Sequence, residues 1–520
     1  MPPENTALNT ASTFYITTPI FYVNGAPHLG HAYTSIAADT LARWKRLDGI
    51  DVLFVTGTDE HGQKVEQAAR DAGIEPQAFV DGVSAKFRAL GPVLNLSNDV
   101  FIRTTEARHA RACQEIWRRL RDNGDIYLGY YEGWYALRDE AFYNEEELTT
   151  ATDGTRFAPS GAPVEWMREP SYFFRLSNWG DRLLEFYDAI PDRILPPGRR
   201  NEVISFVRGG LKDLAVSRSG FAWGVPVPDD TDHVMYVWLD ALINYLTACG
   251  FPDDADPLWR FWPADIHVVG KDIIRFHAVI WPAVCMAAGL PAPQRIVAHG
   301  WWTARGEKMS KSLGNAIDGI ALVETYGIDA VRFFVLREIP FGNDGDFSDA
   351  ALIRRLNAEL ANDLGNLSQR TLSQIAKNLG GVLPAASAPT DADSALLDPV
   401  RALPATLRPM MDRMALGDAL EEIWKTIRAA NAYVDHQAPW ALRKTDPARM
   451  AAVLRVLVDT LRVIATVLTP FMPDSMGRML DQLGVPAKNR NLASLDIAIP
   501  EEVVLPAPQG IFPRYVETEA

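Results

Sequence analysis

The chain has 520 residues, of which 48% are hydrophobic and 22% are charged, and its formal net charge is −15. This length predicts two or three domains, and the acidic balance excludes a protein that coats nucleic acid through a general basic field. The three cysteines match neither a disulfide framework nor a zinc-binding spacing. No secretory signal or membrane-spanning run is visible, so we expect a cytoplasmic protein with no membrane partner.

The first predicted elements are a strand, a loop, a helix and a second strand. Strand-favouring residues fill 14–17 and 52–56, and apolar residues recur at helical spacing over 36–47. His28 and His31 lie at the start of this helix, on one face. A helix start attracts phosphate, and imidazoles donate hydrogen bonds to phosphoryl oxygens. The pair predicts a phosphate site, and the alternatives are a metal pair or ordinary loop histidines.

Residues 56–62 directly follow the second strand, at the edge of an α/β sheet where ligand groups gather. Asp59 is a candidate for binding an ammonium group, and the alternative is that residues 59–61 start and cap a helix. From about 124 to 223, aromatic residues and turn sequences predict a mainly β insertion, closed by a helix around 179–187.

The α/β pattern then resumes, with apolar runs at 234–240, 266–270 and 296–300 that we interpret as buried strands. Aromatic residues follow the first two runs at helical spacing. On such helices aromatic residues usually belong to the core, and the alternative is a pocket, since the strand ends converge on the same crevice. Lys308 and Lys311 then stand among serines and glycines. They indicate either a mobile cationic loop suited to a polyphosphate or a solvated surface turn.

From about residue 352 the sequence is almost entirely helical in pattern. A connector rich in Gly, Pro, Ala and Asp occupies 379–399, and apolar residues between 450 and 468 form a helical stripe. An earlier stripe consists of Leu352, Leu356, Leu360, Leu364 and Leu367. These features predict an α-helical bundle.

Two motifs give the chain a family resemblance. Pro27-His28-Leu29-Gly30-His31 and Lys308-Met309-Ser310-Lys311-Ser312 resemble the paired signatures of class I aminoacyl-tRNA synthetases. The segments that resemble methionyl-tRNA synthetases in particular are 18–25, 56–62, 169–174, 236–241, 270–277 and 361–366. The resemblance covers nearly the whole chain.

This resemblance implies an α/β fold. A Rossmann-like parallel-sheet catalytic domain would carry a mainly β connective insertion and precede an α-helical bundle that binds the anticodon. The implied divisions are a first catalytic half at 13–122, the insertion at 123–224, a second catalytic half at 225–304, a linker with the lysine loop at 305–354 and the bundle at 355–520.

The implied activity is that of a methionine–tRNA ligase. The carboxylate of L-methionine would attack the α-phosphorus of ATP, giving methionyl-adenylate and pyrophosphate. The methionyl group would then pass to the 3′-terminal adenosine of tRNA(Met), initiator tRNA included. Because a carboxylate is already nucleophilic, the first step requires alignment and charge neutralisation rather than a general base. Mg²⁺ is expected with ATP.

The site residues are implied by motif position. His28 and His31 would hold the ATP phosphates, and Lys308 and Lys311 would stabilise the departing pyrophosphate. The whole implied ATP site is His28, Gly30, His31, Gly270, Asp272, His299, Gly300, Lys308, Met309 and Lys311. The implied methionine site is Ile20, Tyr22, Asp59, Trp238, Ala241, Leu242, Tyr245, Ile273, His277 and Trp281, with Asp59 and the Ile20 backbone on the ammonium group.

Anticodon contact would involve Asn366, Arg370, Pro439 and Trp440, since amide, guanidinium and indole groups bind and stack unpaired bases. The alternative is that Asn366 and Arg370 form a solvated pair and that Trp440 belongs to the core. Many family members carry Cys-x-x-Cys zinc knuckles in the insertion, but residues 135–139 and 157–161 lack cysteine here. We therefore expect no metal site and no structural zinc. No appended tRNA-binding domain is expected after the last helices, which favours a monomer.

Three alternatives were weighed against this interpretation. The class I synthetases for isoleucine, valine and leucine carry a large editing insertion, for which the spacing here leaves no room. The cysteine enzyme uses an active-site zinc, for which these cysteines are unsuited. A small-molecule nucleotidyltransferase of the H-x-G-H type has no need of a helical bundle. A non-catalytic tRNA-binding paralogue has no physical reason to retain both histidines, both lysines and Asp59.

Overall fold

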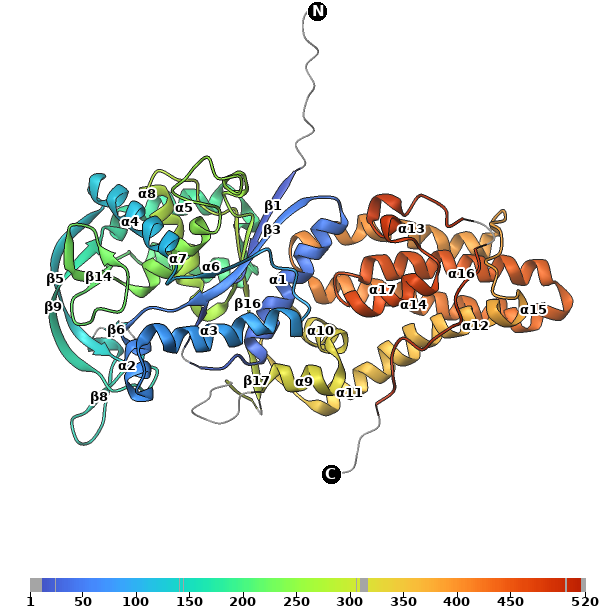
Figure 1. Cartoon of the computed structure of the whole chain (residues 1–520), viewed down its shortest axis with the longest axis horizontal. Coiled ribbons are helices and arrows are strands. Elements are labelled where there is room, and N and C mark those ends of the chain that lie inside the picture. The colour runs from blue at the N-terminus through green and yellow to red at the C-terminus, as the bar shows by residue number, and fades with distance from the viewer. Residues whose placement is uncertain are drawn as a thin grey trace, which may run out of the picture.

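The chain folds into an α/β part and a helical bundle that lie side by side (Figure 1). This computed structural model describes residues 12–23, 25–139, 141–143, 145–304, 306–308, 317–500 and 503–515. Within these ranges no helix is both long enough and apolar enough to cross a membrane.

A seven-stranded parallel sheet forms the centre of the α/β part, in the order β10-β16-β15-β1-β3-β2 with β4 paired to β3. The strands are β1 (Thr13–Thr17), β2 (Phe21–Tyr22), β3 (Asp51–Asp59), β4 (Val100–Arg103), β10 (Ile194–Leu195), β15 (Ile266–Gly270) and β16 (Arg295–His299). This arrangement confirms the predicted Rossmann-like sheet and the strands expected at 14–17, 52–56, 266–270 and 296–300.

Helices cover both faces of the sheet because neighbouring side chains on a strand point to opposite sides. Phe14 and Ile16 pack in the same core as α1, whereas Tyr15 between them packs against α4, α7 and α8. These helices and their neighbours are α1 (Leu29–Leu47), α2 (Gln63–Ala72), α3 (Pro76–Val93), α4 (Ala107–Asp122), α7 (Val237–Thr247) and α8 (Trp281–Ala287).

The predicted insertion is mainly β, as expected. Its largest sheet is antiparallel and consists of β11 (Leu214–Ala215), β9 (Glu165–Phe174), β5 (Ile126–Ala136) and β6 (Ala141–Tyr143). Smaller sheets contain β7 (Thr149–Thr150) and β8 (Arg156–Phe157), and β12 (Ser217–Arg218), β13 (Pro226–Val227) and β14 (Asp230–Met235). The helices are α5 (Gly180–Asp188), which was predicted, and α6 (Pro197–Arg208). In the segment between α5 and α6, strand β10 pairs with β16 and so belongs to the parallel sheet.

The prediction of a buried strand at 234–240 was wrong over most of its length. Of these residues only Val234 and Met235 belong to a strand, β14, and that strand pairs antiparallel outside the main sheet. Val237 starts α7, whose residues are nearly all buried. A continuous apolar run does not distinguish a buried strand from a buried helix, which is why the pattern misled.

The bundle and the linker before it complete the chain. Their helices are α9 (Gly319–Tyr326), α10 (Ile328–Arg337), α11 (Asp349–Arg355), a π-helical segment (Leu356–Gly365), α12 (Asn366–Asn378), α13 (Asp391–Asp412), α14 (Leu416–Gln437), α15 (Pro439–Thr445), α16 (Pro447–Leu468) and α17 (Pro473–Gln482). The linker also contains β17 (Trp302–Ala304), β18 (Glu307–Lys308) and β19 (Gly345–Phe347). All five leucines of the predicted stripe are buried. The first four recur every four residues, and the wide turns of the π-helix keep them on one side.

The connector predicted at 379–399 is shorter than expected. Helix α13 begins at Asp391, where Thr390 caps it and the side chain of Asp393 accepts a hydrogen bond from the Thr390 backbone. This reciprocal capping box outweighs the Pro and Ala content on which the prediction rested.

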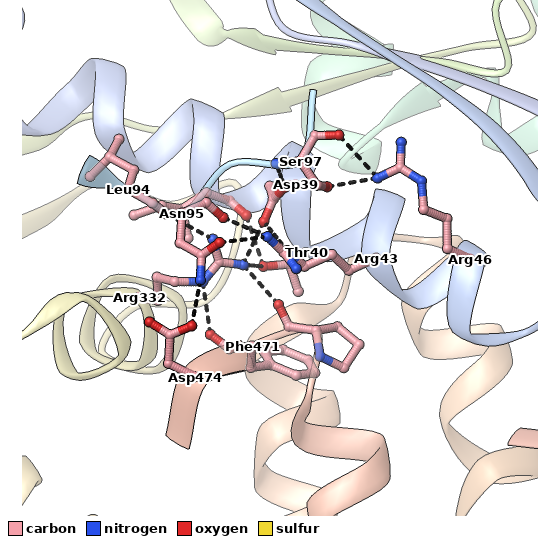
Figure 2. Close-up of polar contacts among 12 residues, drawn as sticks. Asp39, Thr40, Arg43, Arg46, Leu94, Asn95, Ser97, Arg332, Phe471 and Asp474 are labelled. Carbon is pink, nitrogen blue, oxygen red and sulfur yellow. Dashed lines mark hydrogen bonds and ion pairs between the residues drawn. The ribbon is translucent and has the colours of Figure 1, made fainter. Parts of the chain in front are cut away.

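Helix α1 joins the two parts of the molecule. One continuous hydrophobic core contains residues of α1, of the sheet and of the bundle helices. At its centre Arg332 of α10 forms an ion pair with Asp39 of α1 and donates hydrogen bonds to the carbonyl oxygens of Pro470 and Phe471 (Figure 2). The bundle is therefore docked through buried apolar and polar contacts alike.

Candidate active site and anticodon-binding surface

A cavity of about 550 Å³ opens at the carboxyl ends of the parallel strands, between the first turn of α1 and helix α7. Its size is that of a small-molecule site, and the edge of the sheet is where open α/β proteins bind ligands. The predicted residues that line it are Ile20, Tyr22, His28, Gly30, His31, Asp59, Trp238, Ala241, Leu242, Tyr245, Gly270, Asp272, Ile273, His277, His299 and Gly300. Residues predicted for ATP and for methionine thus share one cavity.

The first turn of α1 is built by its two histidines. His28 is the N-cap residue, its Nδ1 accepts a hydrogen bond from the Gly30 amide at 3.0 Å, and its own amide donates to His31 Nδ1 at 3.1 Å. Gly30 is required for this fold-back, because a Cβ there would lie 2.9 Å from Cε1 of His28. The reciprocal cap presents both imidazoles at the positive end of the helix dipole.

Aromatic rings hold His31 in place. The rings of Phe21 and Phe87 stack on each other, and both meet the His31 ring edge to face, at 5.0 and 5.2 Å between centroids. The predicted phosphate-binding pair therefore sits on a packed support.

The helix start suggested for residues 59–61 was wrong, because Asp59 ends β3 and α2 begins only at Gln63.

The opposite wall is formed by α7 and the segment after β15. Trp238 stacks on Phe276 with ring centroids 3.8 Å apart. The hydroxyl of Tyr245 lies 2.8 Å from His277 Nε2, and His277 Nδ1 lies 3.1 Å from the Ile273 carbonyl oxygen. Burial lowers the pKa of His277 to about 4. At neutral pH this imidazole is uncharged, with Nδ1–H donating to the carbonyl and Nε2 accepting from Tyr245.

Trp281 is the one described member of the predicted site that does not line the cavity. Trp281 is fully buried behind the cavity wall. Its ring lies 6.0 Å from that of Tyr245, and its Nε1 donates to His267 Nε2 at 3.2 Å.

Part of the lysine loop lies outside the described residues, namely Met309, Lys311 and the side chain of Lys308. Their assignments stay predictions.

Sequence reasoning missed several residues of the cavity wall. Thr34 follows Gly30 by one helical turn, and its hydroxyl lies 2.7 Å from Nε2 of His299. Lys64, in the first turn of α2, also lines the cavity. The helical spacing from Gly30 was the signal that could have identified Thr34. No comparable pattern pointed to Asp139, which enters from the insertion.

A second, smaller cavity of about 240 Å³ lies in the bundle, between α12, α14, α15 and α16. Arg370, Pro439 and Trp440 line it, and the Arg370 guanidinium lies over the Trp440 ring at 5.4 Å. Trp440 is 46% exposed, so the suggestion that it belongs to the core was wrong. Arg370 pairs with Asp435 at 2.7 Å, and Asn366 is exposed one turn earlier on α12.

This surface is created by a sharp turn between α14 and α15. Ala438 adopts a left-handed conformation with φ of 45°, and Pro439 starts the next helix. Helix α15, which carries Trp440, lies at the end of the bundle farthest from the sheet (Figure 1). An exposed indole beside a guanidinium is a suitable platform for stacking unpaired bases.

Comparisons with known proteins match both parts of the chain. The family described as "tRNA synthetases class I (M)" matches residues 14–372, and that described as "Anticodon binding domain of methionyl tRNA ligase" matches residues 383–517. A methionine–tRNA ligase of Mesorhizobium japonicum is 55% identical over 506 residues, which cover 97% of this chain and 98% of the relative. One of Brucella suis is 54% identical over 507 residues, with the same coverage.

Two solved structures are similar to this chain in both fold and sequence. Mycobacterium tuberculosis methionyl-tRNA synthetase in complex with methionyl-adenylate superimposes with a TM-score of 0.94 at 52% identity, over 97% of this chain and 100% of that one. The apo form from the same organism gives a TM-score of 0.89 at 48% identity, over 98% and 99% of the two chains.

Proposed function

Because the chain belongs to the methionyl-tRNA synthetase family of class I aminoacyl-tRNA synthetases, we propose that its central cavity binds ATP and L-methionine side by side. The reaction is the ligation of methionine to tRNA in two steps. A carboxylate oxygen of methionine bonds to the α-phosphorus of ATP while the bond to the bridging oxygen of pyrophosphate breaks. A hydroxyl group of the 3′-terminal adenosine of tRNA then takes the methionyl group, and AMP leaves.

The ATP phosphates lie at the first turn of α1 in this proposal. The Nδ1 atoms of His28 and His31 take part in the helix cap, so Nε2 of each ring is the atom assigned to phosphoryl oxygens. The dipole of α1 adds to their attraction for anions. Lys308 and Lys311 are assigned to the pyrophosphate, and Gly270, Asp272, His299, Gly300 and Met309 to the rest of the nucleotide.

Methionine lies against α7. Asp59, at the end of β3, and the backbone of Ile20 bind its ammonium group, and Trp238, Tyr245 and His277 surround its thioether. An uncharged His277 suits this role, because a buried cation beside a thioether would cost free energy without compensation. Polarizable sulfur also gains from contact with aromatic rings. We assign Tyr22, Ala241, Leu242 and Ile273 to the same pocket, with Trp281 supporting it from behind.

The bundle reads the tRNA anticodon, and Asn366, Arg370, Pro439 and Trp440 are assigned to that contact. We further propose that ATP enters as its Mg²⁺ complex, that initiator and elongator tRNA(Met) are both substrates, and that the enzyme is a cytoplasmic monomer. The described cysteines are all buried and unpaired, as expected for a reducing compartment.

The single observation that carries the assignment is that the capped histidines of α1 and the aromatic wall of α7 face one cavity. ATP–pyrophosphate exchange with each of the twenty amino acids, without tRNA, tests it. Exchange driven by methionine alone supports both the reaction and the pocket. Exchange driven by another amino acid contradicts the pocket assignment, and exchange with none contradicts the activity.

A further inference from the structure

Behind the aromatic wall of α7 lies a buried cluster of charged and polar side chains to which the proposed reaction assigns no role. Asp240 of α7 is fully buried between two histidines from other elements. Its Oδ2 lies 2.6 Å from Nδ1 of His61, which follows β3, and its Oδ1 lies 2.7 Å from Nε2 of His109 on α4. None of the three lines the cavity. Yet Ala241, next to Asp240, and Asp59, two residues before His61, both do.

The cluster contacts α7 at two residues, Asp240 and Thr247. Nδ1 of His109 lies 2.9 Å from the hydroxyl oxygen of Thr247, two turns after Asp240 on the same helix. One imidazole of α4 therefore bridges two residues of α7. Burial raises the pKa of the Asp240 carboxyl, but its two imidazole partners lower it more, so the pKa stays below its usual value. The group is thus an ionised carboxylate whose oxygens both accept N–H bonds.

The segment that carries Asp59 is also fastened on its other side. Glu60 is fully buried, and its carboxylate accepts two hydrogen bonds from Arg103, at 2.7 and 3.0 Å. The indole of Trp223 donates to the Glu60 carbonyl oxygen at 2.7 Å and packs against the His61 ring with centroids 5.6 Å apart. Both residues after Asp59 are consequently held by charged partners, Glu60 by the partly exposed Arg103 and His61 by the buried Asp240.

We propose that Asp240, His61 and His109 form a positioning cluster that fixes the separation between Asp59 and the α7 wall, and thereby sets the affinity for methionine. The proposal rests on the methionine site assigned above. Asp59 and α7 come from distant parts of the chain, and the His61–Asp240 contact directly joins the segment after β3 to α7. A shift of about 1 Å at a binding group suffices to lower the rate of an enzyme strongly. The ATP end of the cavity is built on α1 and has no member in this cluster.

Two variants of His61 separate positioning from a general structural role. His61→Asn keeps an amide donor close to the position of Nδ1, whereas His61→Leu removes the donor and leaves Asp240 with one partner. In ATP–pyrophosphate exchange we expect His61→Leu to raise KM for methionine at least about tenfold, while KM for ATP changes less than about twofold. His61→Asn should stay within about threefold of the wild type for both substrates.

Asp240→Asn is the second variant, to be used if His61→Leu does not fold. We expect it to raise KM for methionine and not KM for ATP. Asp393→Asn is the matched control, because Asp393 is an equally buried carboxylate held by Arg449 in the bundle, and it should leave both KM values unchanged. Unchanged methionine KM in folded His61→Leu or Asp240→Asn, or an equal rise for ATP, overturns the positioning role. A wild type without methionine-dependent exchange instead overturns the proposed function itself.

Discussion

Nη2 of Arg332 lies 2.8 Å from Oδ2 of Asp39, and both side chains are fully buried where α1 meets the bundle (Figure 2). The Asp39 carboxylate also accepts hydrogen bonds from Arg43 and from the amide and hydroxyl of Ser97. Asp39 belongs to the helix whose first turn carries His28 and His31. The junction with the bundle and the assigned phosphate site are therefore parts of one rigid element.

Arg332→Met is expected to lower the free energy of unfolding by about 3–5 kcal/mol, because it leaves the buried Asp39 carboxylate and three carbonyl oxygens, those of Leu94, Pro470 and Phe471, without this partner. Arg408→Met is the matched control. Arg408 also joins the bundle to α1, through Asp48, but it is 46% exposed and its loss should cost about 1 kcal/mol or less. Urea denaturation measures both. Equal losses would contradict the importance of burial at this junction.

Trp440→Ala is expected to weaken tRNA charging without affecting adenylate formation. Loss of one stacked base costs about 1–3 kcal/mol, so kcat/KM for tRNA should fall roughly five- to 150-fold. Methionine-dependent pyrophosphate exchange, which needs no tRNA, should be unchanged and serves as the internal control. If charging stays at the wild-type rate, Trp440 is not an anticodon contact.

Stability should fall with acidification partly because of His277. Burial holds its folded pKa at about 4, below the ordinary value of 6.5. Between these values the unfolded chain binds a proton that the folded chain does not, so stability rises with pH through this window. From pH 7 to pH 5 this one group should account for a loss of about 2 kcal/mol. His277→Gln should reduce the pH-dependent loss by that amount in urea denaturation, and an unaltered loss would contradict the assigned burial effect.

Metal chelation should leave the insertion intact. The hairpin that carries zinc knuckles in many relatives is packed here around Ala136, Ala158, Ala162 and Val164, with Trp134 and Tyr143 against them. Treatment with 1,10-phenanthroline followed by measurement of exchange with Mg²⁺ present should show full activity. A loss of activity that zinc restores would overturn the expectation of a metal-free insertion.

Local patterns predicted most of the fold because strands and helices of this chain follow their apolar periodicity. The exceptions have physical reasons. Residues 237–240 form a helix rather than a strand because full burial erases the periodicity that separates the two. Residues 391–399 are helical despite Pro399, because the cap at Thr390 starts α13 before it.

The candidate site was predictable only where its residues belong to short motifs. His28, Gly30 and His31 are adjacent in sequence, and the structure brings them into one cavity with Asp59 and Trp238. The cluster of Asp240 was not predictable, since His61 and His109 each lie more than a hundred residues from Asp240 in the sequence and only tertiary packing joins them to it. For the same reason the buried position of Trp281 could not be distinguished from a place in the cavity wall.

The central claim is that the capped histidines of α1 bind the ATP phosphates, and pyrophosphate exchange by His28→Asn and His31→Asn tests it most directly. Asparagine is a good capping residue, and its carboxamide replaces Nδ1 in the helix cap while removing Nε2. Both variants should therefore unfold like the wild type. Exchange with methionine should fall about 100- to 1,000-fold, the usual cost of one lost transition-state donor. Wild-type exchange in either folded variant would show that this imidazole does not hold the phosphates.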